Sequence, residues 1–437
     1  MALDRDKGSI YKFFKVFVTL LYLVSPQMNV SLFANELPHT AAQLLESFSG
    51  RDAANYEPFF RFSEKSRITS VEIHAVGMEN TAARYSGQEG TYKEVNNILR
   101  INTADGFEGI SGVDTYYLEN FNDEHLLELA SVAQELVSLN SLDPVEVLKI
   151  LVKTRPDLSD GARASIDISL WDLASKKADR PLYEFLGSKR DSIEPYASLP
   201  FYESLPEHIE AVQQYAKLGY RIFKFHVWGS IEEDMQLVKL VQQTFADSPY
   251  RFMIDLEGVY DIEDALRLGR KMDEGLFIWL EGPIDDQLLL QSAELRRKLT
   301  THIIPVGYKI YSPEFIRQGI EAESWDAGRF DVTVVGGVTK SLQLLRIAND
   351  AELTIDIQSW GHSLGQAVNL HLMLANERTR YFEAPMPKDV FEFGMKNGNL
   401  LKEGRVRAPH GTGLGIDVDW EHLTTADFYV TSRLIFQ

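Results

Sequence analysis

Titratable side chains recur at a nearly regular interval through the second half of the chain, each close to the end of an apolar, strand-like stretch. These residues are Lys224, His226, Asp255, Glu281, Asp331, His362 and Glu383. Counted from His226, the successive steps are 29, 26, 50, 31 and 21 residues. A (β/α)₈ barrel uses about 30 residues per strand and helix, and it carries its chemistry where strands end. The spacing therefore predicts one functional group per barrel strand, with an extra unit around Tyr308 inside the long step.

The alternation of side chains within each predicted strand sets which groups point into the barrel. Strands of this kind are predicted at 222–227, 252–258, 278–283, 330–333 and 381–383. In the first, a period of two places Lys224 and His226 on one face and apolar residues on the other, which suits packing against outer helices. In the second, the same rule groups Asp255 with Glu257. We therefore expect these four polar side chains to face inward.

Two kinds of chemistry follow from these residue types. Carboxylates that converge from adjacent strands repel one another unless a cation lies among them, and hard oxygen ligands with room for water and substrate suit Mg²⁺. An Asp beside a His is an acid/base device, since the carboxylate orients the imidazole and raises its pKa. Together they predict proton abstraction next to a carboxylate, with the metal holding the enediolate that forms.

Seven motifs resemble the mandelate racemase group of the enolase superfamily. They are INTADGFEG at 101–109, IDISLWDL at 166–173, KFH at 224–226, DLE at 255–257, WLEGP at 279–283, DVTVVGGVT at 331–339 and GHSLG at 361–365. The resemblance extends over residues 66–437, and the order and spacing of the motifs make it specific. The resemblance implies a TIM-type (β/α) barrel of the modified, enolase-like kind with an α+β capping domain, and it also implies a homo-oligomer.

The resemblance implies roles for individual residues. Asp255 and Glu281 would ligate Mg²⁺, and Asp331 with His362 would form the general acid/base dyad.

Three further roles follow in the same way. Lys224 matches the first lysine of the family's Lys-x-Lys motif, which contacts the substrate carboxylate and the growing enediolate charge. His226 stands where the second lysine, a base on the opposite face of the substrate, would be. Glu383 matches a glutamate that can donate a hydrogen bond to the same carboxylate.

Two departures from the family pattern bear on the expected reaction. The third metal ligand of the family is a glutamate, and the matching position holds Tyr308, whose neutral phenol is a poor Mg²⁺ ligand. Glu257 could supply a compensating carboxylate or act as a hydrogen-bond partner behind the ligands. Replacement of the second lysine by His226 counts against a symmetric two-lysine epimerase and leaves His362 as the expected base.

Composition excludes several classes of protein. The 437 residues are 44% apolar, enough for a large core and about two domains. A net charge of -20 argues against nucleic-acid binding, and no run reaches the roughly 18 apolar residues of a membrane span. The absence of cysteine excludes disulfides, thiolate nucleophiles and iron-sulfur sites.

The chain is expected to have four parts. Residues 1–65 form an N-terminal extension, residues 66–190 the α+β cap, residues 191–375 most of the barrel, and residues 376–437 its end and the return to the cap. Within the cap, residues 77–95 would form a mobile loop that shapes specificity.

The N-terminal extension leaves the start of the chain and its compartment open. A basic and apolar run at residues 12–24 resembles a secretory signal, although no small-x-small cleavage site follows. Translation from Met28 is the alternative. We expect a cytoplasmic protein, or an exported, periplasmic one if residues 1–34 act as a signal.

The leading functional hypothesis is a Mg²⁺-dependent sugar-acid dehydratase, a hydro-lyase whose product is a 2-keto-3-deoxy acid. Its substrate would be a small-molecule carboxylate that loses its α-proton and then its 3-hydroxyl group. Racemisation, epimerisation or cycloisomerisation through the same enediolate is the second enzymatic hypothesis. A third hypothesis, of another class, is a degenerate member that binds a carboxylate without turnover because Tyr308 has removed a metal ligand.

Overall fold

The computed structural model describes residues 66–80, 92–114, 121–188, 190–307, 312–424 and 429–437. The chain divides into two units, residues 1–56 and 57–437, and every described residue belongs to the second unit. The predicted extension at 1–65, its signal-like run and Tyr308 all lie outside the described residues.

A four-stranded antiparallel sheet forms the basis of the cap. Its order is β14-β1-β2-β3, with β1 at Ile68–Asn80, β2 at Tyr92–Thr103, β3 at Glu108–Asp114 and β14 at Tyr429–Phe436. The last strand of the described residues, β14, thus pairs antiparallel with the first, β1. The domain boundaries themselves stay predictions.

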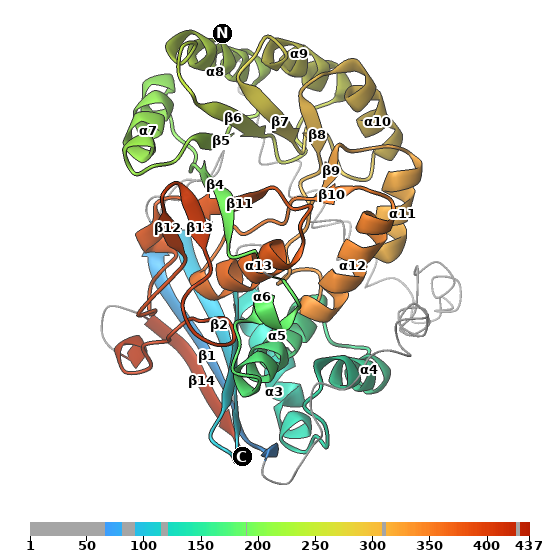
Figure 1. Cartoon of the computed structure of the whole chain (residues 1–437), viewed down its shortest axis with the longest axis vertical. Helices are drawn as coiled ribbons and strands as arrows, with labels where there is room; N and C mark the ends of the chain where they lie inside the picture. The colour runs from blue at the N-terminus through green and yellow to red at the C-terminus, as the bar shows by residue number, and fades with distance from the viewer. Residues whose placement is uncertain (1–65, 81–91, 115–120, 189, 308–311, 425–428) are drawn as a thin grey trace, which may run out of the picture. The chain divides into compact units, whose positions relative to one another are not determined.

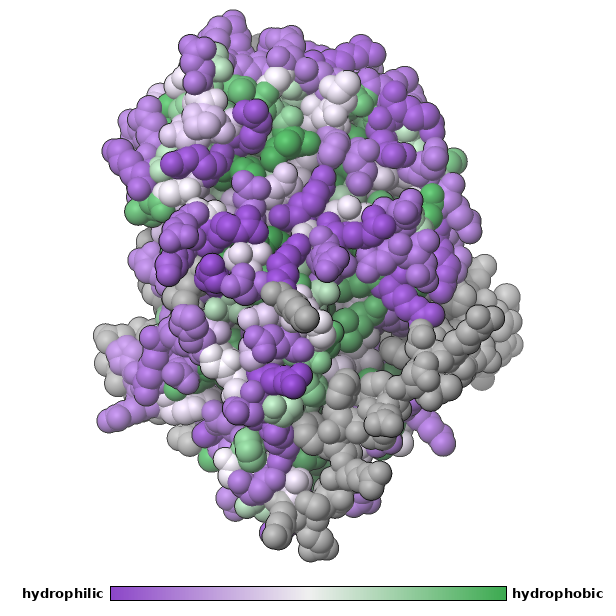
Figure 2. Space-filling model, in the orientation of Figure 1, coloured by the Kyte–Doolittle hydropathy of each residue, from purple (hydrophilic) through white to green (hydrophobic). Residues whose placement is uncertain are grey.

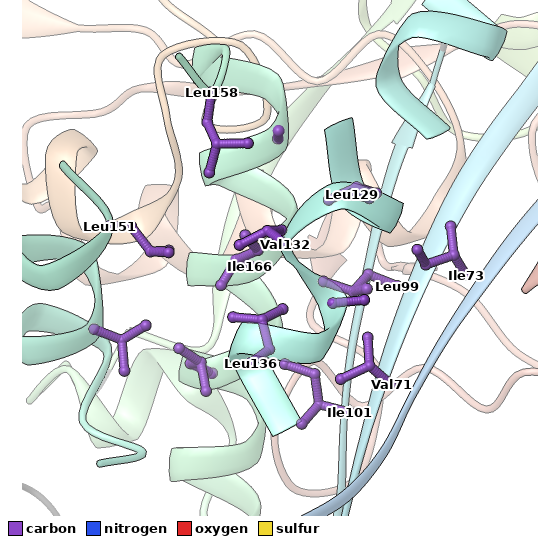
Figure 3. Close-up of a cluster of buried hydrophobic side chains, with 14 of the residues drawn as sticks. Val71, Ile73, Leu99, Ile101, Leu129, Val132, Leu136, Leu151, Leu158 and Ile166 are labelled. Atoms are coloured by element: carbon purple, nitrogen blue, oxygen red, sulfur yellow. The ribbon is translucent and has the colours of Figure 1, made fainter. Parts of the chain in front are cut away.

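Helices complete the cap. α3 (Phe121–Val137) and α5 (Asp160–Lys177) pack on the sheet, while α4 (Pro144–Thr154) and the short α6 (Leu182–Phe185) pack on α5. Figure 3 shows side chains of β1 and β2, such as Val71 and Leu99, meeting those of α3 and α5, such as Val132 and Ile166. Because these residues are almost completely buried, the apolar faces of sheet and helices supply the cap's stability.

Parallel strands form the barrel. They are β4 (Ser192–Ser198), β5 (Ile222–His226), β6 (Arg251–Asp255), β7 (Phe277–Glu281), β8 (His302–Ile304), β9 (Ala327–Gly328), β10 (Thr354–Ile355) and β11 (Tyr381–Pro385). β4 to β8 pair in sequence order, β9 pairs with β10, and β11 closes on β4. A backbone hydrogen bond from Asp326 to Ile303 links the two groups of strands.

Figure 1 shows helices on the outside of the barrel strands. These helices are α7 (Leu205–Lys217), α8 (Ile231–Thr244), α9 (Ile262–Met272), α10 (Leu289–Lys298), α11 (Pro313–Glu321), α12 (Val338–Asp350) and α13 (Ser363–Ala375). The interior begins with a cluster that contains Ile222, Met253 and Trp279. Each lies two residues before Lys224, Asp255 or Glu281, so the predicted inward direction of these three groups is confirmed. The expected fold, a TIM-type barrel with an α+β cap, is confirmed with it.

The chain after β11 adds short elements around the barrel and the cap. They are η2 (Lys388–Val390), β12 (Leu400–Lys402), β13 (Arg405–Arg407) and η3 (His422–Thr424). β13 pairs antiparallel with β4.

Two aspartates of α5 join the cap to these later segments. Asp172 accepts hydrogen bonds from the backbone of Ile110 and Leu414, at 2.8 and 2.7 Å. Asp167 accepts from the backbone of Thr339, at 2.9 Å. The motif at 166–173 is therefore a junction between α5, β3 and the start of α12.

Three predictions about local structure are wrong. The strand at 252–258 ends at Asp255, because Glu257 and Gly258 adopt positive φ angles of 50° and 76° and break the alternation. Residues 330–333 are not a strand, since β9 ends at Gly328 and a turn begins after Asp331. The loop at 77–95 is shorter than expected, because β1 and β2 stay paired out to Asn80 and Tyr92. Residues 81–91 lie outside the described residues.

The visible face in Figure 2 is mainly hydrophilic, with apolar residues scattered between polar ones. Among the described residues, no helix is long and apolar enough to cross a membrane.

Candidate active site

Lys224 lies at the centre of a buried cluster of carboxylates. Its Nζ is 3.1 Å from Asp255 Oδ2, 3.1 Å from Glu281 Oε2 and 2.7 Å from Glu383 Oε1. The strand register places these groups together. His226 pairs with Asp255 across β5 and β6, Asp255 pairs with Glu281 across β6 and β7, and Lys224 lies two residues before His226 on β5. The structure thus brings four of the predicted site residues into direct contact.

Arg329 is a fifth member that sequence reasoning did not identify. The residue is completely buried, and its Nε lies 2.8 Å from Glu281 Oε1 while one terminal nitrogen lies 2.8 Å from Glu383 Oε2. That same nitrogen donates to the Tyr196 hydroxyl at 3.0 Å. Arg329 follows β9 within the short segment Ala327-Gly328-Arg329-Phe330, and a charge in an otherwise apolar stretch is the only signal that the sequence offers.

Each oxygen of the three carboxylates lies near a cation or a hydrogen-bond donor. Asp255 Oδ1 accepts from the backbone N–H of Glu257 at 3.1 Å, and its Oδ2 faces Lys224. The Glu281 oxygens face Lys224 and Arg329. The Glu383 oxygens face the same two cations and also accept from Ser198 Oγ and the backbone of Ser359, at 2.9 and 3.2 Å.

The protonation states follow from burial and from the ion pairs. Burial alone would lower the pKa of Lys224, but Glu281 and Glu383 hold that pKa well above its usual value, and the same carboxylates do so for Arg329. Burial is likewise outweighed at Asp255 and Glu383, where Lys224 lowers the pKa. At Glu281 burial wins over Arg329 and raises the pKa. Among the three carboxylates, burial therefore opposes the charged form of Glu281 more than its neighbouring cations favour it.

His226 lies at the edge of this cluster with one ring nitrogen directed into it. Its Nδ1 donates to the carbonyl of Leu199 at 2.6 Å, which leaves Nε2 unprotonated in the neutral ring. Nε2 lies 3.5 Å from Asp255 Oδ2, and the ring packs edge-on against Trp360 at 5.1 Å. Burial lowers the pKa of His226. The side chain is thus a neutral base next to a carboxylate.

Asp331 and His362, the predicted dyad, have other partners. Asp331 Oδ1 accepts from the backbone and hydroxyl of Thr333, both at 2.7 Å, and from Asn369 at 3.0 Å, which holds the turn before α12. His362 precedes α13, and its Nε2 donates to the carbonyl of Phe393 at 2.9 Å.

The other ring nitrogen of His362 is also engaged. Its Nδ1 accepts a hydrogen bond from the Asn96 amide of β2. Burial lowers the pKa of His362 to about 4. These two hydrogen bonds of the imidazole are therefore with uncharged groups.

The fit of this site to Mg²⁺ depends on Asp255 and Glu281, the two expected ligands. Over the part of the chain that the structure describes, no three His, Cys, Asp or Glu side chains are grouped so that they could hold a metal ion. Glu257 is exposed, and its backbone rather than its carboxylate supports Asp255. Both expected ligands already contact buried cations. The described residues therefore do not fit a divalent-metal site.

Comparisons with known proteins identify the family. Residues 79–187 match the mandelate racemase / muconate lactonizing enzyme N-terminal domain, and residues 207–422 match the enolase C-terminal domain-like family. A crystal structure described as a mandelate racemase/muconate lactonizing enzyme from Pseudovibrio sp. is 30% identical, with a TM-score of 0.80, over 85% of this chain and 99% of that one. The chain belongs to the mandelate racemase/muconate lactonizing enzyme group of the enolase superfamily.

Relatives in this group catalyse different reactions. The L-talarate/galactarate dehydratase of Salmonella typhimurium LT2, solved with Mg and L-lyxarohydroxamate, has a TM-score of 0.76 and 22% identity, and the match covers 85% of this chain and 95% of that one. The D-Ala-D/L-Ala epimerase of Cytophaga hutchinsonii is 24% identical over 82% of this chain and 97% of its own length. Enolase-superfamily chemistry is therefore supported, with lyases and isomerases both among the relatives and Mg as the metal of the solved dehydratases.

Proposed function

We propose that this protein removes the proton next to the carboxylate of a small hydroxy acid, and that the substrate is a sugar acid that loses water. The observation that carries the proposal is the arrangement of His226, Asp255 and Lys224 at the ends of adjacent barrel strands. A neutral imidazole nitrogen lies 3.5 Å from a carboxylate and beside a buried ammonium group. A base, a stabiliser for its protonated form and a cation for the enediolate are thus next to one another.

His226 is the acid/base group in this proposal. When Nε2 takes the substrate proton, the ring becomes an imidazolium whose charge Asp255 stabilises, while the Leu199 carbonyl keeps its orientation. Asp331 and His362 remain the alternative that the family resemblance implies. Their contacts favour a supporting role, because Asp331 holds a turn and His362 is bound between Asn96 and Phe393.

The dehydration would proceed in two steps. His226 first removes the proton on C2, and the electron pair becomes an enediolate whose negative charge faces Lys224. The protonated ring then returns its proton to the 3-hydroxyl group, so that water leaves as the C2–C3 double bond forms. The resulting enol tautomerises to a 2-keto-3-deoxy acid. The presence of His226 instead of a second lysine supports dehydration over two-base epimerisation, and dehydratases are among the relatives.

The test is a panel of aldonic and aldaric acids incubated with the full chain in D₂O, with Mg²⁺ and separately with EDTA. A 2-keto product that disappears in His226→Asn supports the proposal. Deuterium at C2 without a keto product would replace it with racemisation, epimerisation or cycloisomerisation. No deuterium and no product across the panel would count against any enzymatic function on these acids.

A second function, carboxylate binding without turnover, has a specific observation in its favour. Lys224 is already neutralised by three carboxylates of the protein, which weakens its ability to stabilise the negative charge of an enediolate. Calorimetric titration with the same acids separates the two functions, because a binding protein gives heat without deuterium exchange.

A further inference from the structure

We propose that the guanidinium of Arg329, together with Lys224, takes the place of a divalent cation at the centre of this barrel, so that the protein does not bind Mg²⁺ there. In the resting site, two cations of the protein would occupy the space of the metal. Metal binding tests this independently of turnover and therefore of the proposed reaction.

First, Arg329 occupies the position of the expected metal, because it contacts one of the two expected ligands. Arg329 reaches both Glu281 and Glu383 at 2.8 Å, and Glu281 is one of the two carboxylates that would ligate the metal. The other, Asp255, contacts Lys224 at 3.1 Å. A guanidinium presents several donors in one plane and can bridge two carboxylates, which is the task that a metal ion otherwise performs.

Second, neither cation can reach solvent or lose its charge. Arg329 and Lys224 are buried, at 0% and 1% exposure, and an arginine does not lose its proton in a protein. An Mg²⁺ ion between Asp255 and Glu281 would take up carboxylate oxygens that now face the two cations. It would also place a double charge beside two fixed positive charges in a region of low dielectric constant.

The third support is that Arg329 is held from other directions as well. Its terminal nitrogens donate to the Tyr196 hydroxyl at 3.0 Å and to the Asp356 carbonyl at 3.4 Å. Tyr196 is itself buried in the barrel interior. The Arg329 guanidinium is thus fixed in the barrel core by several partners, so a metal ion could not bind simply by moving a surface side chain.

The experiment is a titration of the full chain with Mn²⁺, with free Mn²⁺ followed by electron paramagnetic resonance, and a competing titration with Mg²⁺. We expect no stoichiometric binding by the wild type. Arg329→Gln removes the charge and should bind Mn²⁺ at least roughly tenfold more tightly. The matched control is Arg380→Gln, because Arg380 also lies near Trp279 but pairs with Asp356 and should leave metal binding unchanged.

Stoichiometric Mn²⁺ binding by the wild type, displaced by Mg²⁺, would overturn the inference. So would a folded Arg329→Gln protein that gains no affinity. If Arg329→Gln does not fold, Arg329→Lys replaces it. That variant keeps the charge and should still exclude Mn²⁺, whereas tight binding by it would show that charge is not what keeps the metal out.

Discussion

Asn96 of the cap and His362 of the barrel are hydrogen bonded, although 266 residues separate them in the chain. His362 donates through Nε2 to Phe393, so its Nδ1 must be the acceptor of the Asn96 amide. The Phe393 carbonyl therefore sets the tautomer, and a strand of the cap contacts the remaining nitrogen of a barrel histidine that the family resemblance assigns to proton transfer.

The relative effects of two histidine variants decide which residue is the base. We expect His226→Asn to reduce kcat by several orders of magnitude, because it removes the neutral nitrogen beside Asp255. His362→Asn should cost much less, since both of its ring nitrogens bind uncharged groups. Steady-state rates on the first substrate found would measure both. The reverse order would restore the Asp331 and His362 dyad.

Removing one charge from the buried cluster should destabilise the protein. Glu383→Gln leaves Arg329 and Lys224 with too little negative charge around them, and breaking a buried ion pair typically costs about 3–5 kcal/mol. Urea denaturation followed by circular dichroism would measure the loss. Glu232→Gln is the control, because its partner Arg267 lies on the surface, and no measurable change is expected. Equal stability of the two variants would show that the cluster contributes little to folding.

Stability should fall in mild acid. Burial lowers the pKa of His371 from 6.5 to about 4, so the unfolded chain takes up a proton at a higher pH than the folded protein does. Stability is therefore lost as pH falls from about 6.5 towards 4, by roughly 3 kcal/mol from this residue. His371→Gln should reduce the slope of unfolding free energy against pH in that window. The exposed His410→Gln should leave the slope as it is, and an unchanged slope in His371→Gln would contradict the prediction.

Gly337 should tolerate no side chain. Its φ is 99°, and a Cβ would lie 2.5 Å from Asp167 Oδ2 at the junction between α5 and α12. Gly187 has a similar φ of 94° but no atom within 4 Å of such a Cβ. We expect Gly187→Ala to cost about 1 kcal/mol from backbone strain alone and Gly337→Ala to cost clearly more. Thermal unfolding of the two variants would measure the difference, and matching midpoints would refute the contact argument.

The period of two along strands was enough to predict most of the central cluster. Lys224, Asp255 and Glu281 lie near the ends of strands with several apolar neighbours, so their inward direction follows from alternation. Alternation failed at Glu257, where a left-handed backbone turns the chain after Asp255. Local sequence carries no sign of that turn except the following glycine.

Arg329 and Asn96 could not be predicted for a different reason. Arg329 follows a strand of only two residues, which is too short to show an alternation of side chains. A single arginine in a sequence is also normally expected to be exposed to solvent. Asn96 meets His362 only because the cap and barrel fold together, and spacing along one chain does not encode such a contact. The ion pairs and hydrogen bonds at the centre therefore had to be seen in three dimensions.

The pairing of β14 with β1 has a consequence for synthesis on the ribosome. One edge of β1 stays open until the chain has been made through to Phe436, after the entire barrel. The roughly 350 residues between the two strands take about 20–70 seconds to translate at 5–20 residues per second. During that interval the nascent cap presents an unpaired strand edge, which is the kind of surface that recruits chaperones or other nascent chains. The cap, although begun first, is thus the part of the molecule that is completed last.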